Sequence, residues 1–283
     1  MTPGLSAGQL TQLAPGVRRL VAPNPGMMTG PGTNTYIIGR REVAVIDPGP
    51  AMAGHVDATL DAIADRVGAV LRWVLVTHTH SDHSPAATLL ASRSGAALLG
   101  RPPPPGRHQD AAFLPDRVLE DGEVFATSEF TLDVIHTPGH ASNHLTFRHG
   151  ALDWLFTGDH VINGSTVVID PPDGNMSAYL HSLEKIKSYR LAAIAPGHGE
   201  LIEEPYAAID ALIRHRLARE KKVLDAVRAD SALTSGELVS RVYRDVDSSL
   251  YSVAERSLLA HLEKLEADGS VRRDGQRWEA LQR

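Results

Sequence analysis

Residues 78–83 concentrate side chains that bind metal ions. Three histidines and one aspartate lie within six residues, at His78, His80, Asp82 and His83. Imidazole nitrogen and carboxylate oxygen are the ligands that a borderline cation such as zinc prefers. His78 and His80 can point the same way from an extended loop, whereas Asp82 and His83 follow after the chain has begun to turn. The sequence therefore predicts that this loop supplies part of the ligands for each of two metal sites.

The residues on either side of this loop predict the elements that position it. Residues 73–76 read Trp-Val-Leu-Val, an apolar run rich in strand-forming residues. Pro85 follows the loop, and proline is favoured at the start of a helix because the first helical position needs no backbone N–H. We therefore expect a strand, a tight polar loop and a helix that continues to about Ser94.

Three further ligand residues follow apolar runs later in the chain. Each lies on a glycine-containing turn just past an expected strand, and they are His140, Asp159 and His198. Glycine lets the backbone bend sharply and lets a side chain approach a ligand closely. Four strand ends that carry ligand residues indicate that these residues supply the missing halves of the two sites.

Three further polar residues, Asp47, His144 and His160, could also contribute to the site. Asp47 closes the expected strand 43–46, and we expect its carboxylate to orient the histidine loop by hydrogen bonds rather than to bind a metal. For His144 and His160 we favour structural roles. His144 is the one expected to lie nearest the site, and a contact from His160 to a ligand or to substrate stays open as an alternative.

The motif His-x-His-x-Asp-His, followed by single His, Asp and His residues on strand-end turns, resembles the metallo-beta-lactamase fold superfamily. The resemblance implies an α/β fold, an αββα sandwich with a one- or two-metal hydrolytic site along one edge. Carried over to this sequence, the resemblance implies that His78, His80 and His140 bind the first metal. Asp82, His83 and His198 would bind the second metal, and Asp159 would bridge the two. Residues 24–26 and 32–36 resemble one branch, the lactamase-beta-2-like hydrolases.

Composition excludes several other classes of protein. The chain has 283 residues, 42% of them hydrophobic and 22% charged, which is ordinary for a globular protein with a large core and an accessory domain. It has no cysteine, which excludes disulfides, thiol nucleophiles and thiolate zinc sites. We see no secretory signal and no membrane-spanning apolar run, so we expect a cytoplasmic protein without a membrane partner.

The pattern changes after His198 from strand ends to helices. We expect a catalytic domain at residues 1–204 and a winged-helix domain at residues 205–283, with three helices and a hairpin turning at Asp274-Gly275. Thr234-Ser235-Gly236-Glu237 fits a capping box at the start of the second helix. The lactamase-beta-2-like branch carries a similar small C-terminal domain.

Charge bears on what the C-terminal domain binds. Its third helix would read DNA in a winged-helix regulator, but glutamates interrupt the basic residues there, which is unfavourable beside phosphates. Arginines on the hairpin could still touch a phosphate backbone, and they are Arg272, Arg273 and Arg277. We favour a domain that caps the substrate site, with nucleic-acid binding as the alternative and DNA not expected.

The resemblance implies hydrolysis by a hydroxide held between two metal ions, without a side-chain nucleophile. Asp82 would be a metal ligand and also the catalytic residue, because it can orient the hydroxide or shuttle its proton. Zinc, two ions per chain, is the metal that the nitrogen-rich ligand set favours. Ligand type does not exclude iron or manganese, and the sequence does not indicate the oligomeric state.

The residue types of the chain limit the range of expected substrates. An aspartate at the bridging position and the absence of cysteine argue against antibiotic hydrolysis. The similar branch includes thioesterases that release polyketide chains and an endoribonuclease for single-stranded RNA. A net charge of −6 and 5% aromatic residues favour a small ester or thioester over RNA. RNA or phosphodiester cleavage is the alternative, and a winged-helix DNA-binding regulator with a metal-binding sensor domain is a further one.

Overall fold

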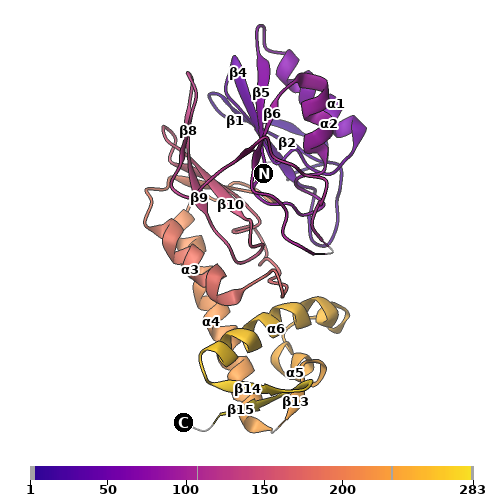
Figure 1. Ribbon diagram of the computed structural model, residues 1–283, viewed down its shortest axis with the longest axis vertical. Coiled ribbons are helices and arrows are strands. Elements are labelled where there is room, and N and C mark those ends of the chain that lie inside the picture. Colours follow the sequence, from indigo (N-terminus) through magenta and orange to yellow (C-terminus); the bar gives the residue numbers. More distant parts are fainter. Residues whose placement is uncertain (1–3, 107, 231, 282–283) are drawn as a thin grey trace.

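Two β-sheets form the centre of the larger part of the molecule (Figure 1). The computed structural model describes residues 4–106, 108–230 and 232–281. The strands of the first sheet are β1 (Leu10–Ala14), β2 (Val17–Val21), β3 (Asn34–Ile38), β4 (Glu42–Ile46), β5 (Val70–Leu75), β6 (Ala97–Gly100) and β7 (Arg117–Val118). Those of the second are β8 (Val124–Ala126), β9 (Thr131–His136), β10 (Leu145–His149), β11 (Trp154–Gly158) and β12 (Ala193–Pro196).

The first sheet keeps the order of the sequence, from β1 to β7. Its first four strands pair antiparallel, and β4, β5, β6 and β7 pair parallel. Parallel strands are usually covered on both faces, and the apolar side chains of β4 are buried accordingly. The parallel pairing places the carboxyl ends of β4 and β5 at one edge of the sheet, where Asp47 and the histidine loop follow.

The second sheet has the order β12-β11-β10-β9-β8. Strands β9 and β11 each pair antiparallel with β10, and β12 pairs parallel with β11. Strands β9, β11 and β12 therefore run in the same direction. Their carboxyl ends meet at one edge, and this is why His140, Asp159 and His198 come together although they are far apart in the sequence.

Helices cover the outer faces of both sheets. The apolar layer between the sheets contains residues such as Ile46 and Leu75 from the first sheet and Phe147 and Phe156 from the second. Helices α1 (Ala53–Ala64) and α2 (Ala86–Ser94) bury their apolar residues against the first sheet, and α3 (Met176–Lys187) does so against the second. The result is the expected αββα sandwich.

The rest of the chain forms a second, smaller body below the sandwich in Figure 1. Its elements are α4 (Pro205–Ala229), β13 (Leu233–Thr234), α5 (Ser235–Val242), η1 (Ser248–Leu250), α6 (Tyr251–Ala267), β14 (Val271–Asp274) and β15 (Arg277–Ala280). In α4, Ile209 packs in the same cluster as α3, whereas Val223 and Val227 belong to the C-terminal core. The helix thus joins both cores, and the division at residue 204 stays a prediction. None of the helices described could cross a membrane.

Two local expectations differ from the structure. The Thr234–Glu237 capping box is present, but the hairpin turn lies one residue later than expected, because Asp274 pairs with Arg277 and leaves Gly275 as the first turn residue. Gly275 has φ of 59°, a conformation that glycine adopts at no steric cost, so the glycine rather than the Asp-Gly pair sets the register. Strand β1 was not expected either, because its residues do not alternate clearly between apolar and polar.

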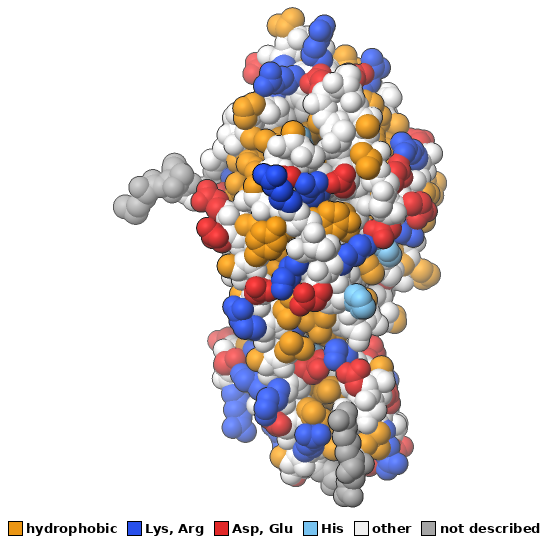
Figure 2. All heavy atoms as spheres, turned by 90° about the vertical axis from the view of Figure 1, so that its left-hand side faces the viewer, with side chains coloured by type: hydrophobic (Ala, Val, Ile, Leu, Met, Phe, Trp, Pro, Cys, Tyr) orange, Lys and Arg blue, Asp and Glu red, His pale blue; other side chains and the backbone are white. Residues whose placement is uncertain are grey.

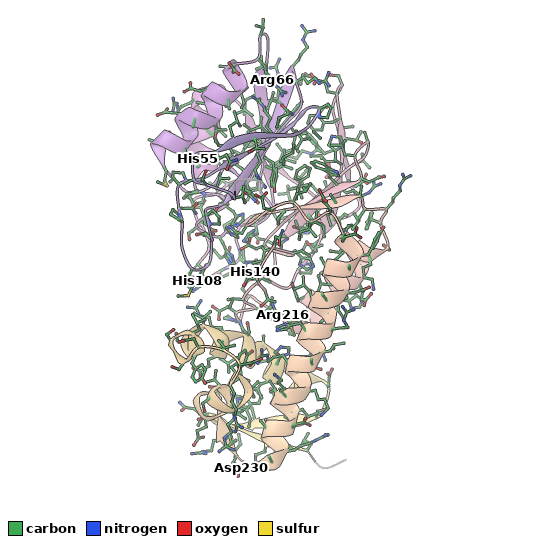
Figure 3. The ribbon with its side chains drawn as sticks, turned by 180° about the vertical axis from the view of Figure 1, so that it is seen from behind. His55, Arg66, His108, His140, Arg216 and Asp230 are labelled. Carbon is green, nitrogen blue, oxygen red and sulfur yellow. The ribbon has the colours of Figure 1, made fainter. Side chains whose placement is uncertain are left out.

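His55 of α1, labelled in Figure 3, predicts a pH-dependent stability. Burial lowers the pKa of His55 to about 4, and its Nε2 lies 2.9 Å from Thr35 Oγ1. The unfolded chain binds this proton near pH 6.5 and the folded chain only near pH 4, so stability falls as the pH drops through this window. We expect a loss of about 3 kcal/mol in the free energy of unfolding from this residue. In urea unfolding of the metal-free protein between pH 7 and 4, the free energy of unfolding should depend less steeply on pH in His55→Gln than in the wild type. An equal slope in the two proteins would contradict the assignment.

Candidate metal centre

The strand ends bring all seven expected ligand residues into one cluster at the edge that faces the C-terminal body. The histidine loop follows β5, and single residues follow β9, β11 and β12. Their ligand atoms form three overlapping groups, each within 4.8 Å: His78, His80 and His140; His78, His83 and Asp159; and Asp82, His83 and His198. The first and third groups match the two sets of ligands expected from the sequence.

The first group consists of three imidazoles. His80 Nδ1 and His140 Nε2 face each other at 2.9 Å. The His78 ring centroid lies 4.6 Å from that of His80 and 5.1 Å from that of His140. Three nitrogens directed at one point are a donor set that suits zinc.

The second group combines two imidazoles with a carboxylate. Asp82 Oδ2 lies 3.2 Å from His198 Nε2 and 3.4 Å from His83 Nε2, and it accepts a hydrogen bond of 3.3 Å from Thr33 Oγ1. The Asp82 side chain keeps 24% of its surface exposed. It is therefore positioned to face both the cluster and a bound molecule.

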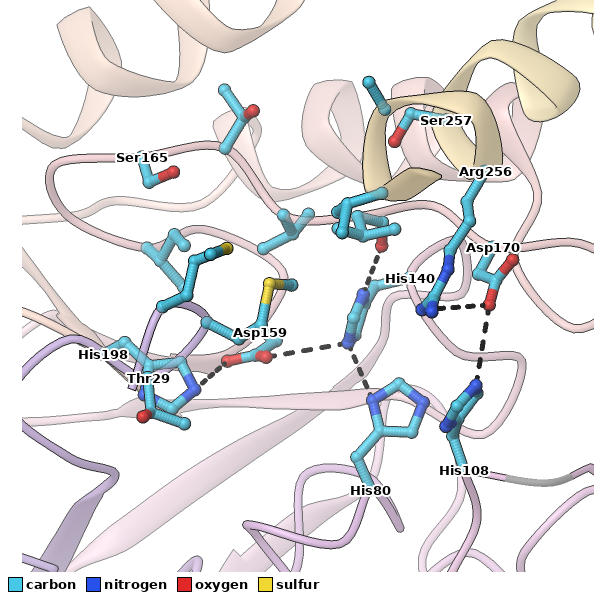
Figure 4. Close-up of a pocket in the computed structure, with 18 of the residues that line it drawn as sticks. Thr29, His80, His108, His140, Asp159, Ser165, Asp170, His198, Arg256 and Ser257 are labelled. Carbon is cyan, nitrogen blue, oxygen red and sulfur yellow. Dashed lines mark hydrogen bonds and ion pairs between the residues drawn. The ribbon is translucent and has the colours of Figure 1, made fainter. Parts of the chain in front are cut away.

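Asp159 lies between the two groups (Figure 4). Its Oδ1 is 3.3 Å from His83 Nε2 and 3.2 Å from His198 Nε2, while its Oδ2 is 3.6 Å from His140 Nε2. One carboxylate oxygen thus faces each group. This is the geometry that a carboxylate bridging two cations requires.

Hydrogen bonds at Nδ1 fix which nitrogen each histidine presents. Nδ1 of His83 lies 2.9 Å from Asp47 Oδ2, that of His140 lies 2.7 Å from the Val168 carbonyl, and that of His198 lies 3.3 Å from the Gly32 carbonyl. These oxygens accept, so each Nδ1 carries a proton and each Nε2 is the nitrogen that points into the cluster.

Asp47 supports two of the ligands at once, as expected for a carboxylate that orients the loop. It accepts hydrogen bonds from the backbone N–H and the hydroxyl of Thr77, each at 2.8 Å. The Thr77 hydroxyl, having donated to Asp47, can accept from His78 Nδ1 at 3.0 Å. Asp47 therefore orients His83 directly and His78 through Thr77.

Buried polar atoms without hydrogen-bond partners indicate that the cluster fits metal ions. Among the described residues, His78 Nε2, His83 Nε2 and Asp159 Oδ1 are buried polar atoms without a hydrogen-bond partner. Buried polar groups are almost always paired, since leaving one unpaired is costly. All three atoms belong to the overlapping ligand groups, so cations at this position would satisfy them.

Opposite charges interact strongly within the cluster. Burial alone would raise the pKa of Asp159, but the neighbouring His198 and His83 hold it well below its ordinary value. Burial would lower the pKa of His198, yet Asp159 and Asp82 raise it to about 10. The pKa of His78, by contrast, is lowered by burial and by the surrounding histidines. The carboxylates therefore attract positive charge, while the lowered pKa of His78 keeps its imidazole neutral and able to bind a metal.

A cavity of about 880 Å³ opens onto the cluster between the two bodies. Five of the seven ligands line it, and they are His80, Asp82, His140, Asp159 and His198. The opposite wall comes from α4, η1 and α6, with residues such as Arg216, Leu250, Val253 and Ser257. Figure 3 shows His108, His140 and Arg216 at this level of the molecule. The C-terminal body therefore caps the site, with α6 turned toward the cavity.

Three histidines outside the candidate ligand set lie near the cavity or near the ligands. His108 is exposed and lies 3.9 Å from Asp170, which also meets Arg256 at 3.6 Å (Figure 4). His144 is buried and stacks on His78 with centroids 4.8 Å apart, so it does reach the ligands. His160 is buried against Tyr179, and burial lowers its pKa to about 3, as suits a structural residue.

The fold and this cluster together define a metallo-beta-lactamase-type protein, and comparison with known families agrees. The family model described as Metallo-beta-lactamase superfamily matches residues 28–198, and that described as Beta-lactamase associated winged helix domain matches residues 234–278. The first match alone covers more than half of the chain. The protein belongs to the metallo-beta-lactamase superfamily, whose members are generally hydrolases.

Relatives resemble the chain over nearly its whole length. It is 32% identical over 278 residues to the Beta-lactamase-like protein 2 homolog of Drosophila melanogaster, covering 93% of this chain and 92% of that protein. It is 31% identical over 274 residues to an atrochrysone carboxyl ACP thioesterase of Passalora fulva, covering 92% and 78%. A beta-lactamase domain protein from Burkholderia ambifaria shares the fold, with a TM-score of 0.82 at 22% identity over 99% of this chain and 96% of that one.

Proposed function

We propose that the protein is a dinuclear metal hydrolase that acts on an ester or thioester. The observation that carries this proposal is the position of Asp159, with one oxygen toward each of two ligand groups. The first metal would be held by His78, His80 and His140, and the second by Asp82, His83 and His198. Zinc is the ion that these ligands favour.

The metal sites, Asp82 and the cavity wall would have different roles in hydrolysis. Metal ions bound at such a pair of sites lower the pKa of water toward neutrality and polarise the acyl oxygen. Asp82 would orient the attacking water and receive its proton, because its carboxylate is partly exposed to the cavity and held by Thr33. The described cavity wall, including α6, would limit access of bulk water to the reacting groups.

An acyl substrate fits the walls of the cavity. Apolar side chains from both bodies line it, among them Met27, Met28, Ile162, Leu250 and Val253. Met27 and Met28 are 76% and 53% exposed, so they are accessible to an apolar group that enters. The thioesterase name of the Passalora fulva relative supports a thioester among the acyl substrates.

The charges near the cavity favour single-stranded RNA less than an acyl substrate. Arg219 is paired with Asp245 at 2.8 Å, and Arg256 faces Asp170. On the wing hairpin, Arg272 pairs with Glu279. Figure 2 shows basic and acidic side chains interspersed on the face it draws, whereas RNA binding uses a continuous basic groove.

The proposal is tested by metal content and by turnover together. We expect two zinc ions per chain by mass spectrometry, and hydrolysis of a neutral acyl thioester that stops on chelation and returns with zinc. Cleavage of a fluorescent single-stranded RNA without thioester turnover would reverse the choice of substrate. A protein that binds no metal after reconstitution would refute the site itself.

A further inference from the structure

The segment of residues 167–170 lies between the metal cluster and the C-terminal body. It belongs to no helix or strand, so no ladder of backbone hydrogen bonds fixes its position. Among the described residues, the hydrogen bonds to the backbone groups of residues 167–169 come from three side chains, those of Arg216, His140 and Ser257. Two of these side chains belong to the C-terminal body and the third is an expected metal ligand.

The two contacts from the C-terminal body hold successive parts of this segment. Arg216 of α4 donates from Nη2 to the Val167 carbonyl. Ser257 Oγ of α6 accepts from the Ile169 N–H at 3.3 Å. The peptide groups on both sides of residue 168 are thus tied to α4 and α6.

The residue between these two ties holds the metal ligand. The Val168 carbonyl accepts from His140 Nδ1 at 2.7 Å, which leaves Nε2 directed at His80 and Asp159. A shift of this carbonyl would release Nδ1 and let the imidazole rotate or change tautomer. The orientation of His140 therefore depends on where residue 168 is held.

Packing and charge reinforce the same connection. Val167 and Ile169 are buried in a cluster that includes Ala260 of α6. At the end of the segment, Arg256 of α6 lies 3.6 Å from Asp170. Val167, Ile169 and Asp170 are thus each anchored, in part, by the C-terminal body.

We propose that the C-terminal domain is a positioning element of the metal centre, in which Arg216 and Ser257 set the orientation of His140 through residues 167–169. The inference rests on the proposed metal site. It gives this domain a role at the metals in addition to covering the cavity. Hydrogen-bond partners of metal ligands are typically worth about 10- to 100-fold in metal affinity.

The test uses the full chain with Ser257→Ala, Arg216→Gln and the charge-retaining Arg216→Lys. Chelator competition with zinc should show the affinity for one of the two equivalents falling about 10- to 100-fold in the first two variants, with partial rescue in the lysine variant. In the metal-free protein, nitrogen-15 NMR should show the His140 ring losing its single Nδ1–H form. Arg214→Gln, an exposed residue on the same helix outside the cavity, is the matched control and should leave both readouts unchanged.

The outcomes separate this inference from the proposed function. Wild-type zinc affinity and an unchanged His140 signal in both Ser257→Ala and Arg216→Gln would overturn the inference while leaving the hydrolase intact. A wild-type protein that binds no metal would refute the proposed function, and the NMR measurement would still decide the inference. If Arg216→Gln does not fold, Ser257→Ala carries the test, because it removes a single hydroxyl.

Discussion

Replacing Asp159 with alanine is expected to remove most of the proposed hydrolase activity and one of the two proposed metal ions. Its two oxygens face the two ligand groups, at 3.2 Å from His198 Nε2 and 3.6 Å from His140 Nε2. Alanine leaves two cations to be held close together without the negative charge between them. We expect turnover to fall by about a thousandfold or more, which corresponds to about 4 kcal/mol of transition-state stabilisation.

The measurement is metal content together with thioester turnover at saturating zinc. His160→Ala is the matched control, because His160 is the next residue, is fully buried and faces Tyr179 rather than the ligand groups. This control should retain two metal equivalents even if it lowers thermal stability. Full activity of Asp159→Ala would refute the two-metal mechanism.

The clustering of the seven candidate ligands could be predicted from the sequence because the information about them is local. His78, His80, Asp82 and His83 share one loop, and the other ligands lie on glycine turns after apolar runs. The strand directions then bring these turns to one edge. The sandwich could be predicted with them, since its parallel strands read as continuous apolar runs.

The support of the site could not be predicted in the same way, because it depends on contacts between distant residues of ordinary type. Arg216 and Val167 are 49 positions apart, and Ser257 and Ile169 are 88 apart. No motif marks a serine that accepts from a loop amide. Nor does helical periodicity say that α6 faces the cavity, because the apolar face of a helix can pack in several orientations.

The role of Asp47 could be predicted only in part from the sequence. Replacing this residue is expected to have the second large effect on metal affinity and turnover. Its position after a strand suggested a carboxylate that orients the loop, but only the structure shows that it serves both His83 and Thr77. We expect Asp47→Asn to lose at least one metal ion, with a fall in metal affinity of about 100-fold and a matching loss of turnover. The backbone at Asp47 has φ of 51°, which asparagine tolerates better than most residues, so the substitution changes chemistry more than conformation.

The reason is that an amide cannot replace both carboxylate oxygens. Oδ1 accepts from the Thr77 N–H, and Oδ2 accepts from the Thr77 hydroxyl and from His83 Nδ1. If the amide oxygen keeps the Thr77 N–H, the amide NH₂ meets His83 Nδ1 and favours the tautomer with the proton on Nε2. That nitrogen then has no lone pair for a metal.

Nitrogen-15 NMR of the His83 ring and zinc competition would measure the tautomer and the affinity together. Asp116→Asn is the matched control, since Asp116 also accepts a backbone hydrogen bond at the first sheet, from the Leu98 N–H at 2.8 Å, but lies outside the metal cluster. It removes one negative charge and should leave zinc affinity unchanged. A wild-type tautomer and affinity in Asp47→Asn would show that His83 is oriented by packing alone, and that the carboxylate contributes only to the stability of the loop.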